Sequence, residues 1–205
     1  MESADILTII FLFLAWLGEV TCLKRVRSRW PALTLTCCGI LLACLFAQLR
    51  HPQLLTLFRR DTTRIVAGEW WRMGSALFFQ DGGLWGGITN VLALIWIGSL
   101  VEQTRSRAFW LIVCVTGALV AECFGLRWQP MGAGNSVATC ALAGSLISSL
   151  PLTRMALASK VPRAIAIILA VLLAADRDVH GIGAVTGVLL GLMIPAEVVR
   201  VDPDR

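Results

Sequence analysis

Seven apolar stretches, each near the length of a membrane-spanning helix, constrain the fold of this chain more than any other feature. A bilayer core about 30 Å thick needs about 20 apolar residues per helix, or about 17 at the short end. Only 15% of the residues are charged, against roughly 25% in a soluble domain. We therefore expect an all-α membrane protein with spans at 6–22, 32–49, 84–101, 108–126, 136–150, 162–175 and 179–197. The sixth is short, and it spans only if it borrows flanking residues or its neighbours thin the membrane.

The distribution of lysine and arginine predicts the orientation, because cytoplasmic loops near span ends carry an excess of both. The densest basic cluster is LKRVRSRW at 23–30, between the first two spans. Placing this loop in the cytoplasm puts 11 of the 18 basic residues on that side. The acidic N-terminus MESAD then lies outside, which argues against a cleaved signal peptide.

Charge and cysteine content exclude several classes of partner. The net charge of +5 reflects the basic loops, so no nucleic-acid partner is expected. The seven cysteines lie in or beside apolar segments with no CxxC spacing and no His/Cys cluster, so we predict no metal site and no cofactor. The loop at 50–83 is too long for a simple connector and is expected to lie partly in the membrane interface.

Two potentially reactive residues share one face of the membrane in this topology. Ser136 begins the fifth span and His180, one of two histidines, begins the seventh, and both spans start at the outer face. Taken alone, Ser136 has a second interpretation as a helix cap, and His180 as a solvated interfacial residue. The pair at matched depth favours a functional site. The segment is not a GxSxG nucleophile elbow, because Ala138 stands at the last position and no strand precedes it.

Small residues predict that these two helices pack closely. The seventh span carries Gly183, Gly187 and Gly191 at a spacing of four, and this spacing lets two helix backbones approach. On the fifth span Ser136 is followed by Cys140 and Gly144 at the same spacing. Two small-residue faces, each headed by a reactive group, are what a close Ser–His contact requires.

The chain resembles the rhomboid family of intramembrane serine proteases over about residues 30–198. The family's motifs occur here in its order: GEWWR at 68–72 in the first loop, Asn90 of HxxxN, Glu102 closing that helix, GNS at 134–136, and HGIGAVTG at 180–187. The resemblance implies a six-helix rhomboid-like transmembrane bundle plus one additional N-terminal transmembrane helix. The expected organisation is an N-terminal helix with its basic loop at 1–29, a membrane domain at 30–198 and a cytoplasmic tail at 199–205.

The resemblance also implies a mechanism and a cellular setting. Neutral His180 takes the proton from Ser136, which attacks a peptide carbonyl of a transmembrane protein substrate, in a dyad that needs no acid. Backbone N–H groups around Asn135 and Ser136, with the Asn90 amide, are expected to hold the oxyanion, and Gly134 is expected to support this site. The expected location is a cell membrane, as a multi-pass protein of a bacterial inner membrane in contact with the lipid bilayer.

Three positions depart from the family pattern, and other functions therefore stay open. Gly86 stands where the family has an oxyanion histidine, Val137 follows the serine in place of glycine, and Cys140 replaces an aromatic residue. A weak or inactive rhomboid-like protein that binds transmembrane clients is the alternative. A small transporter has less support, because no charged pairs or broken helices are expected at the midplane of the membrane. Glu19 and Glu122 are expected near span ends, where they reach the interface.

Overall fold

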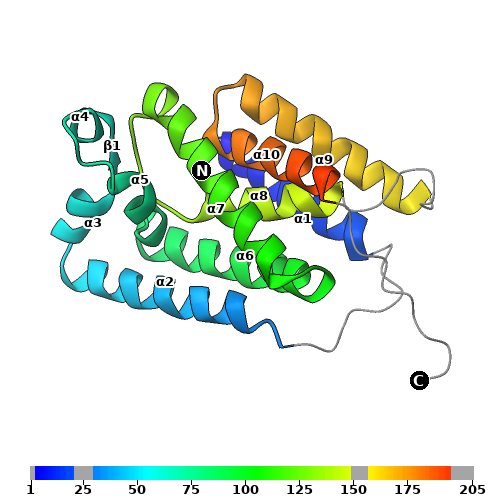
Figure 1. The fold of residues 1–205 in the computed structure, drawn as a ribbon, viewed down its shortest axis with the longest axis horizontal. Coiled ribbons are helices and arrows are strands. Elements are labelled where there is room, and N and C mark those ends of the chain that lie inside the picture. Colours follow the sequence, from blue (N-terminus) through cyan, green and yellow to red (C-terminus); the bar gives the residue numbers. More distant parts are fainter. Residues whose placement is uncertain (1–2, 21–29, 149–156, 195–205) are drawn as a thin grey trace.

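The computed structural model describes residues 3–20, 30–148 and 157–194. It is mostly helical, and one helix occupies each predicted span: α1 Ser3–Val20, α2 Ala32–Arg50, α6 Gly83–Thr104, α7 Arg107–Trp128, α8 Ser136–Ile147, α9 Leu157–Ala175 and α10 Val179–Met193 (Figure 1). Helices α2, α6 and α7 are long and apolar enough to cross a membrane, while α8 and α10 are shorter apolar helices. The helical fold class is thus confirmed. Most of the basic loop, the ends of the first, fifth and seventh predicted spans and the tail at 199–205 lie outside the described residues.

Helix α9 begins at Leu157, five residues before the predicted start at 162, and it contains Pro162. A proline inside a helix removes one backbone hydrogen bond. Contacts on both sides of this proline hold the turn in place, because the Ser159 hydroxyl and Arg163 Nε both donate to the Gly18 carbonyl of α1, at 2.5 and 3.2 Å. Tertiary contacts with α1 therefore extend α9 beyond its apolar run.

Two acidic residues that were predicted to reach the interface are instead buried in ion pairs, and that prediction was wrong. Glu19 pairs with Arg163, which is fully buried. Glu122 Oε1 lies 2.8 Å from Arg60 Nη1, and both side chains are 3% exposed. A charge buried in a low-dielectric interior needs a partner, and each pair joins segments far apart in the sequence. The Glu19–Arg163 pair joins α1 to α9, and the Arg60–Glu122 pair joins the loop at 50–83 to α7.

Helix α8 is the centre of the bundle, in contact with α10, α7, α6 and α1. Every residue from Val137 to Ile147 is buried, which agrees with a helix that is apolar all round. Its 12 residues span about 18 Å at 1.5 Å per residue. This length is well below the thickness of a bilayer core, so α8 starts or ends inside it.

The glycines of α10 lie against the backbone of α8. A Cβ added at Gly187 would lie 2.7 Å from the Ala141 carbonyl carbon, and one at Gly183 would lie 2.5 Å from the Val137 oxygen. The residues opposite the three glycines form a row on α8: Val137, Ala141 and Ser145. This row is offset by one residue from the face predicted from Ser136 and Cys140, although Gly144 also contacts α10 at Ala184.

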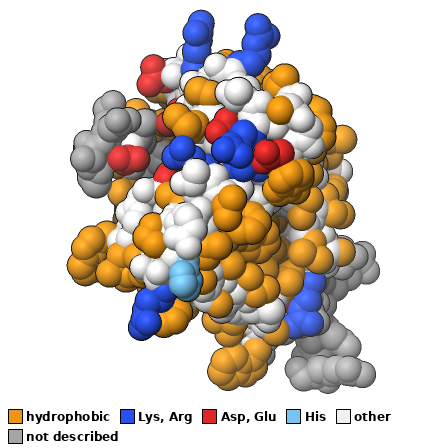
Figure 2. Space-filling model, turned by 90° about the vertical axis from the view of Figure 1, so that its left-hand side faces the viewer, with side chains coloured by type: hydrophobic (Ala, Val, Ile, Leu, Met, Phe, Trp, Pro, Cys, Tyr) orange, Lys and Arg blue, Asp and Glu red, His pale blue; other side chains and the backbone are white. Residues whose placement is uncertain are grey.

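Large apolar side chains cover much of the outer surface. Figure 2 faces the end of the molecule that carries α3–α5 and shows hydrophobic side chains over much of this face, with charged ones gathered in patches. Exposed residues recur along the long helices, as in Ile40, Leu42 and Phe46 of α2, Leu111, Ile112 and Val115 of α7, and Ile165, Ile168 and Val171 of α9. Such a surface suits lipid rather than water as the surrounding solvent.

The loop at 50–83, called the first loop below, folds into short elements between α2 and α6. They are α3 Gln53–Phe58, β1 Arg60–Asp61, α4 Thr62–Val66, α5 Arg72–Ser75 and the 3-10 helix η1 Ala76–Phe78. Strand β1 pairs antiparallel with β2, Met131–Gly132, so that Arg60 lies opposite Gly132. This two-stranded sheet was not predicted, and it joins the loop at 50–83 to the segment that precedes Ser136.

Candidate active site

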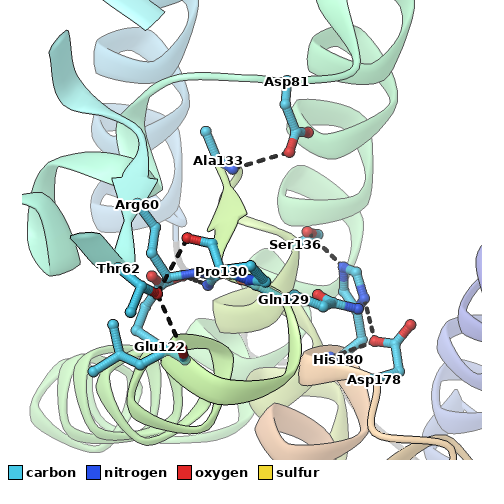
Figure 3. Close-up of polar contacts among 11 residues, drawn as sticks. Arg60, Thr62, Asp81, Glu122, Gln129, Pro130, Ala133, Ser136, Asp178 and His180 are labelled. Atoms are coloured by element: carbon cyan, nitrogen blue, oxygen red, sulfur yellow. Dashed lines mark hydrogen bonds and ion pairs between the residues drawn. The ribbon is translucent and has the colours of Figure 1, made fainter. Parts of the chain in front are cut away.

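Ser136 and His180 meet at one end of the bundle. Ser136 is the first residue of α8, and its Oγ lies 2.8 Å from Nε2 of His180 in the first turn of α10 (Figure 3). The close backbone approach of α8 and α10 brings the two first turns together. The histidine side chain is 24% exposed, so the pair is reachable from outside the helix core.

An acidic residue that was not among the predicted site residues contacts the same histidine. Asp178 precedes α10, and its Oδ1 lies 2.7 Å from His180 Nδ1 and also accepts the His180 backbone N–H at 2.7 Å. Burial alone would raise the pKa of this carboxyl, but the hydrogen bonds and charge of His180 outweigh burial and lower the pKa below its ordinary value. Asp178 is therefore ionised at neutral pH. The sequence feature that could have identified Asp178 is an acidic residue at a helix N-terminus, two positions before a histidine.

The segment that leads into Ser136 is held by the first loop. The Thr62 N–H donates to the Pro130 carbonyl at 3.0 Å, and the Ala133 N–H donates to Asp81 Oδ2 at 3.0 Å (Figure 3). The Gly134 N–H donates to the Ala76 carbonyl at 3.0 Å. This last bond occupies the Gly134 amide, so Gly134 supports the site without a free donor.

A buried amide network lies beside the serine. The Asn90 side chain donates from Nδ2 to Gln80 Oε1 at 2.8 Å, and Gln80 Nε2 donates to Asn135 Oδ1 at 3.1 Å. Gln80 is itself fixed by α2, because Gln48 bonds both its backbone N–H and its carbonyl, at 2.9 and 2.7 Å. Gln80 was not among the predicted site residues. The sequence feature that could have identified it is a polar residue directly after two phenylalanines.

The first turn of α8 begins at Ser136, directly after Asn135 of this network. Asn135 occupies the N-cap position, but its side chain makes no capping bond and is held by the amide network instead. The N–H groups of a first helical turn have no acceptor within the helix. Gly134 has a φ of +154°, and a Cβ there would lie 3.3 Å from Asn90 Nδ2 and 3.5 Å from Ser136 Oγ. Glycine thus leaves space between the serine oxygen and the Asn90 amide.

The three departures from the family pattern lie within four residues of Asn90 or Ser136 in the sequence. A Cβ at Gly86 would meet nothing within 4 Å, so the position is open. Val137 and Cys140 are buried within the bundle. Two other motif residues are structural in this chain: Arg72 donates to the Thr56 and Arg59 carbonyls, and Glu102 accepts the Leu33 and Thr34 N–H groups at the start of α2.

The fold and its surface define a helical membrane bundle, with a serine and a histidine in contact at the start of two central helices. Residues 67–200, more than half of the chain, match the Rhomboid domain. The chain belongs to the rhomboid family. A search of curated proteins finds no match.

Proposed function

We propose that this chain is an intramembrane serine endopeptidase that cleaves transmembrane protein substrates. The observation that carries the proposal is the 2.8 Å contact between Ser136 Oγ and His180 Nε2. A hydroxyl within hydrogen-bond reach of a neutral imidazole is the arrangement that activates a serine nucleophile. The serine also sits beside free N–H groups and the Asn90 amide, where a developing negative charge needs donors.

The proposed reaction proceeds in two stages. Ser136 Oγ attacks the carbonyl carbon of a substrate peptide bond while its proton passes to His180 Nε2. The tetrahedral intermediate collapses, the C–N bond breaks, and the imidazolium returns the proton to the leaving amine. Water then attacks the acyl-enzyme ester with His180 again as base, which releases the carboxylic acid and restores the Ser136 hydroxyl.

The membrane arrangement is part of the proposal. The seven helices form a six-helix core from α2 to α10, with α1 as an additional N-terminal span, in a multi-pass protein of a bacterial inner membrane. Ser136 and His180 lie in the first turns of α8 and α10, which the proposed topology puts at the outer face. A helix of about 18 Å is shorter than the bilayer core, and the proposal takes α8 to start inside the core. Ser136 then lies below the membrane surface, where the peptide bond of a transmembrane segment is presented.

Labelling with a fluorophosphonate probe tests the proposal. The probe reacts with activated serines, so purified wild-type protein is expected to become labelled and Ser136→Ala is expected to remain unlabelled. Equal labelling of both proteins would place the reactive serine elsewhere. Wild-type protein that resists the probe while binding a transmembrane client would favour the alternative, a client-binding rhomboid relative, for which the open position at Gly86 is the supporting observation.

A glutamine replacement tests the amide network. We expect Gln80→Leu to lower the cleavage rate about 10- to 100-fold, because Asn90 loses the acceptor that orients its amide and a misplaced group costs about that much. Asn90→Ala removes the donor itself and is expected to cost about 10²- to 10³-fold in kcat. Gln53→Leu, at an exposed glutamine of α3, is the control. Unchanged kcat in Asn90→Ala would exclude this amide from the oxyanion site.

Cysteine accessibility tests the topology. In a variant without the seven native cysteines, we expect Val66→Cys to react with a membrane-impermeant thiol reagent applied to the outer side of the membrane. Arg205→Cys is expected to react only after the membrane is permeabilised, because the basic loops place the C-terminus in the cytoplasm. Labelling of Arg205→Cys from outside would invert the topology and separate the site from the outer face.

A further inference from the structure

We infer that Asp178 is a positioning residue that completes a Ser136–His180–Asp178 triad in this chain. The inference rests on the proposed function and extends it, because the simple dyad has no group on the second ring nitrogen of the histidine. Here that nitrogen, Nδ1, lies 2.7 Å from Asp178 Oδ1, while Nε2 lies 2.8 Å from Ser136 Oγ (Figure 3).

The carboxylate selects the tautomer of His180. An ionised carboxylate only accepts hydrogen bonds, so Nδ1 must carry the proton that it donates to Asp178. The neutral ring then has no proton on Nε2, which is left as the acceptor for the Ser136 hydroxyl. When Nε2 takes up that proton during attack, the negative charge of Asp178 stabilises the imidazolium that forms.

The backbone around Asp178 is fixed independently of this contact. Arg177 adopts a left-handed conformation with φ +61°, and the Asp178 N–H donates to the Leu173 carbonyl at 3.0 Å. Gly181 lies against the end of α9, where a Cβ would lie 2.6 Å from the Leu173 carbonyl carbon. The carboxylate is thus supplied by a rigid turn between α9 and α10, and its side chain is 8% exposed.

A purely structural role for Asp178 is the competing interpretation. Its Oδ1 also accepts the His180 backbone N–H, which is an ordinary N-cap contact. The two roles separate by substitution, because asparagine and serine are good N-caps but carry no charge. Asp176→Asn is the matched control, the same change at an exposed position of the same turn.

The test compares fluorophosphonate labelling rates of folded wild type, Asp178→Asn, Asp178→Ser and Asp176→Asn across pH. We expect both Asp178 variants to react about 10²- to 10⁴-fold more slowly, with thermal midpoints near that of wild type. The acid limb of their rate profile should move to lower pH, because an imidazolium without a neighbouring anion loses its proton more easily. Asp176→Asn should match wild type in rate and profile.

Few other ionisable groups near α10 could change the pH dependence of the labelling rate. Among described residues of the packed elements, Cys140 of α8 interacts electrostatically with Asp178, and Asp176 and Arg177 lie in the same turn. Glu122 of α7 is paired with Arg60. Wild-type rates in Asp178→Asn, or slower rates with an unmoved acid limb, would overturn the triad while leaving the Ser–His proposal intact. Absence of labelling in wild type would instead remove the proposed function itself.

Discussion

Ser136→Ala and His180→Ala are each expected to reduce cleavage of a model transmembrane substrate by about 10⁵- to 10⁶-fold. Residues that act as a unit lose nearly all of their joint contribution when either one is removed. Neither side chain contributes much to the stability of the fold, because Ser136 and His180 are only partly buried. The contact between α8 and α10 is made by glycines and backbone atoms. The thermal midpoint in detergent should therefore change little.

The other histidine of the chain supplies the control for this experiment. His51 is exposed at the end of α2, so His51→Ala should cleave at the wild-type rate. Cleavage would be followed by gel analysis of the substrate in proteoliposomes. Comparable proteolysis by either Ser136→Ala or His180→Ala would remove the Ser–His pair from the mechanism.

Gly187→Leu is expected to be the most damaging single change outside the polar site. A Cβ at this position would already lie 2.7 Å from the Ala141 carbonyl carbon, so a leucine must push α10 away from α8. Overpacking of this kind costs about 1–3 kcal/mol of stability, occasionally more. Because Ser136 and His180 sit on these two helices, a shift of about 1 Å should also lower the cleavage rate by about 10²-fold.

The chain offers a matched control for the leucine substitution. Gly39 lies in α2 with nothing within 4 Å of a Cβ, so Gly39→Leu makes the same chemical change on an open surface. Thermal stability and cleavage would be measured for both variants. A Gly187→Leu protein that behaves like Gly39→Leu would show that the glycine row does not set the distance between α8 and α10. Val188, the next residue of α10, is a poorer control position, because its backbone nitrogen faces Gly144 of α8 at 3.0 Å from a Cβ built there.

The positions of the helices were predictable because they depend on local composition. A run of apolar residues is hydrophobic whatever surrounds it, so the seven stretches coincide with seven helices. The family assignment was equally local, since the motifs at 68–72, 134–136 and 180–187 are short strings in a set order. The start of α9 was misplaced because contacts with Gly18 of α1 hold the turns around Pro162.

By itself the sequence determined the helical membrane class, the family and the residues nominated for the site, Ser136 and His180 among them. The tertiary structure alone decided which side chains meet: Asp178 on the second ring nitrogen of His180, Gln80 between Asn90 and Asn135, and the buried pairs Glu19–Arg163 and Arg60–Glu122. A helix depends on the residues within a few turns of it. A polar contact depends on the register and separation of elements far apart in the chain, and those are set by packing, such as the approach of α10 to α8 at its glycines.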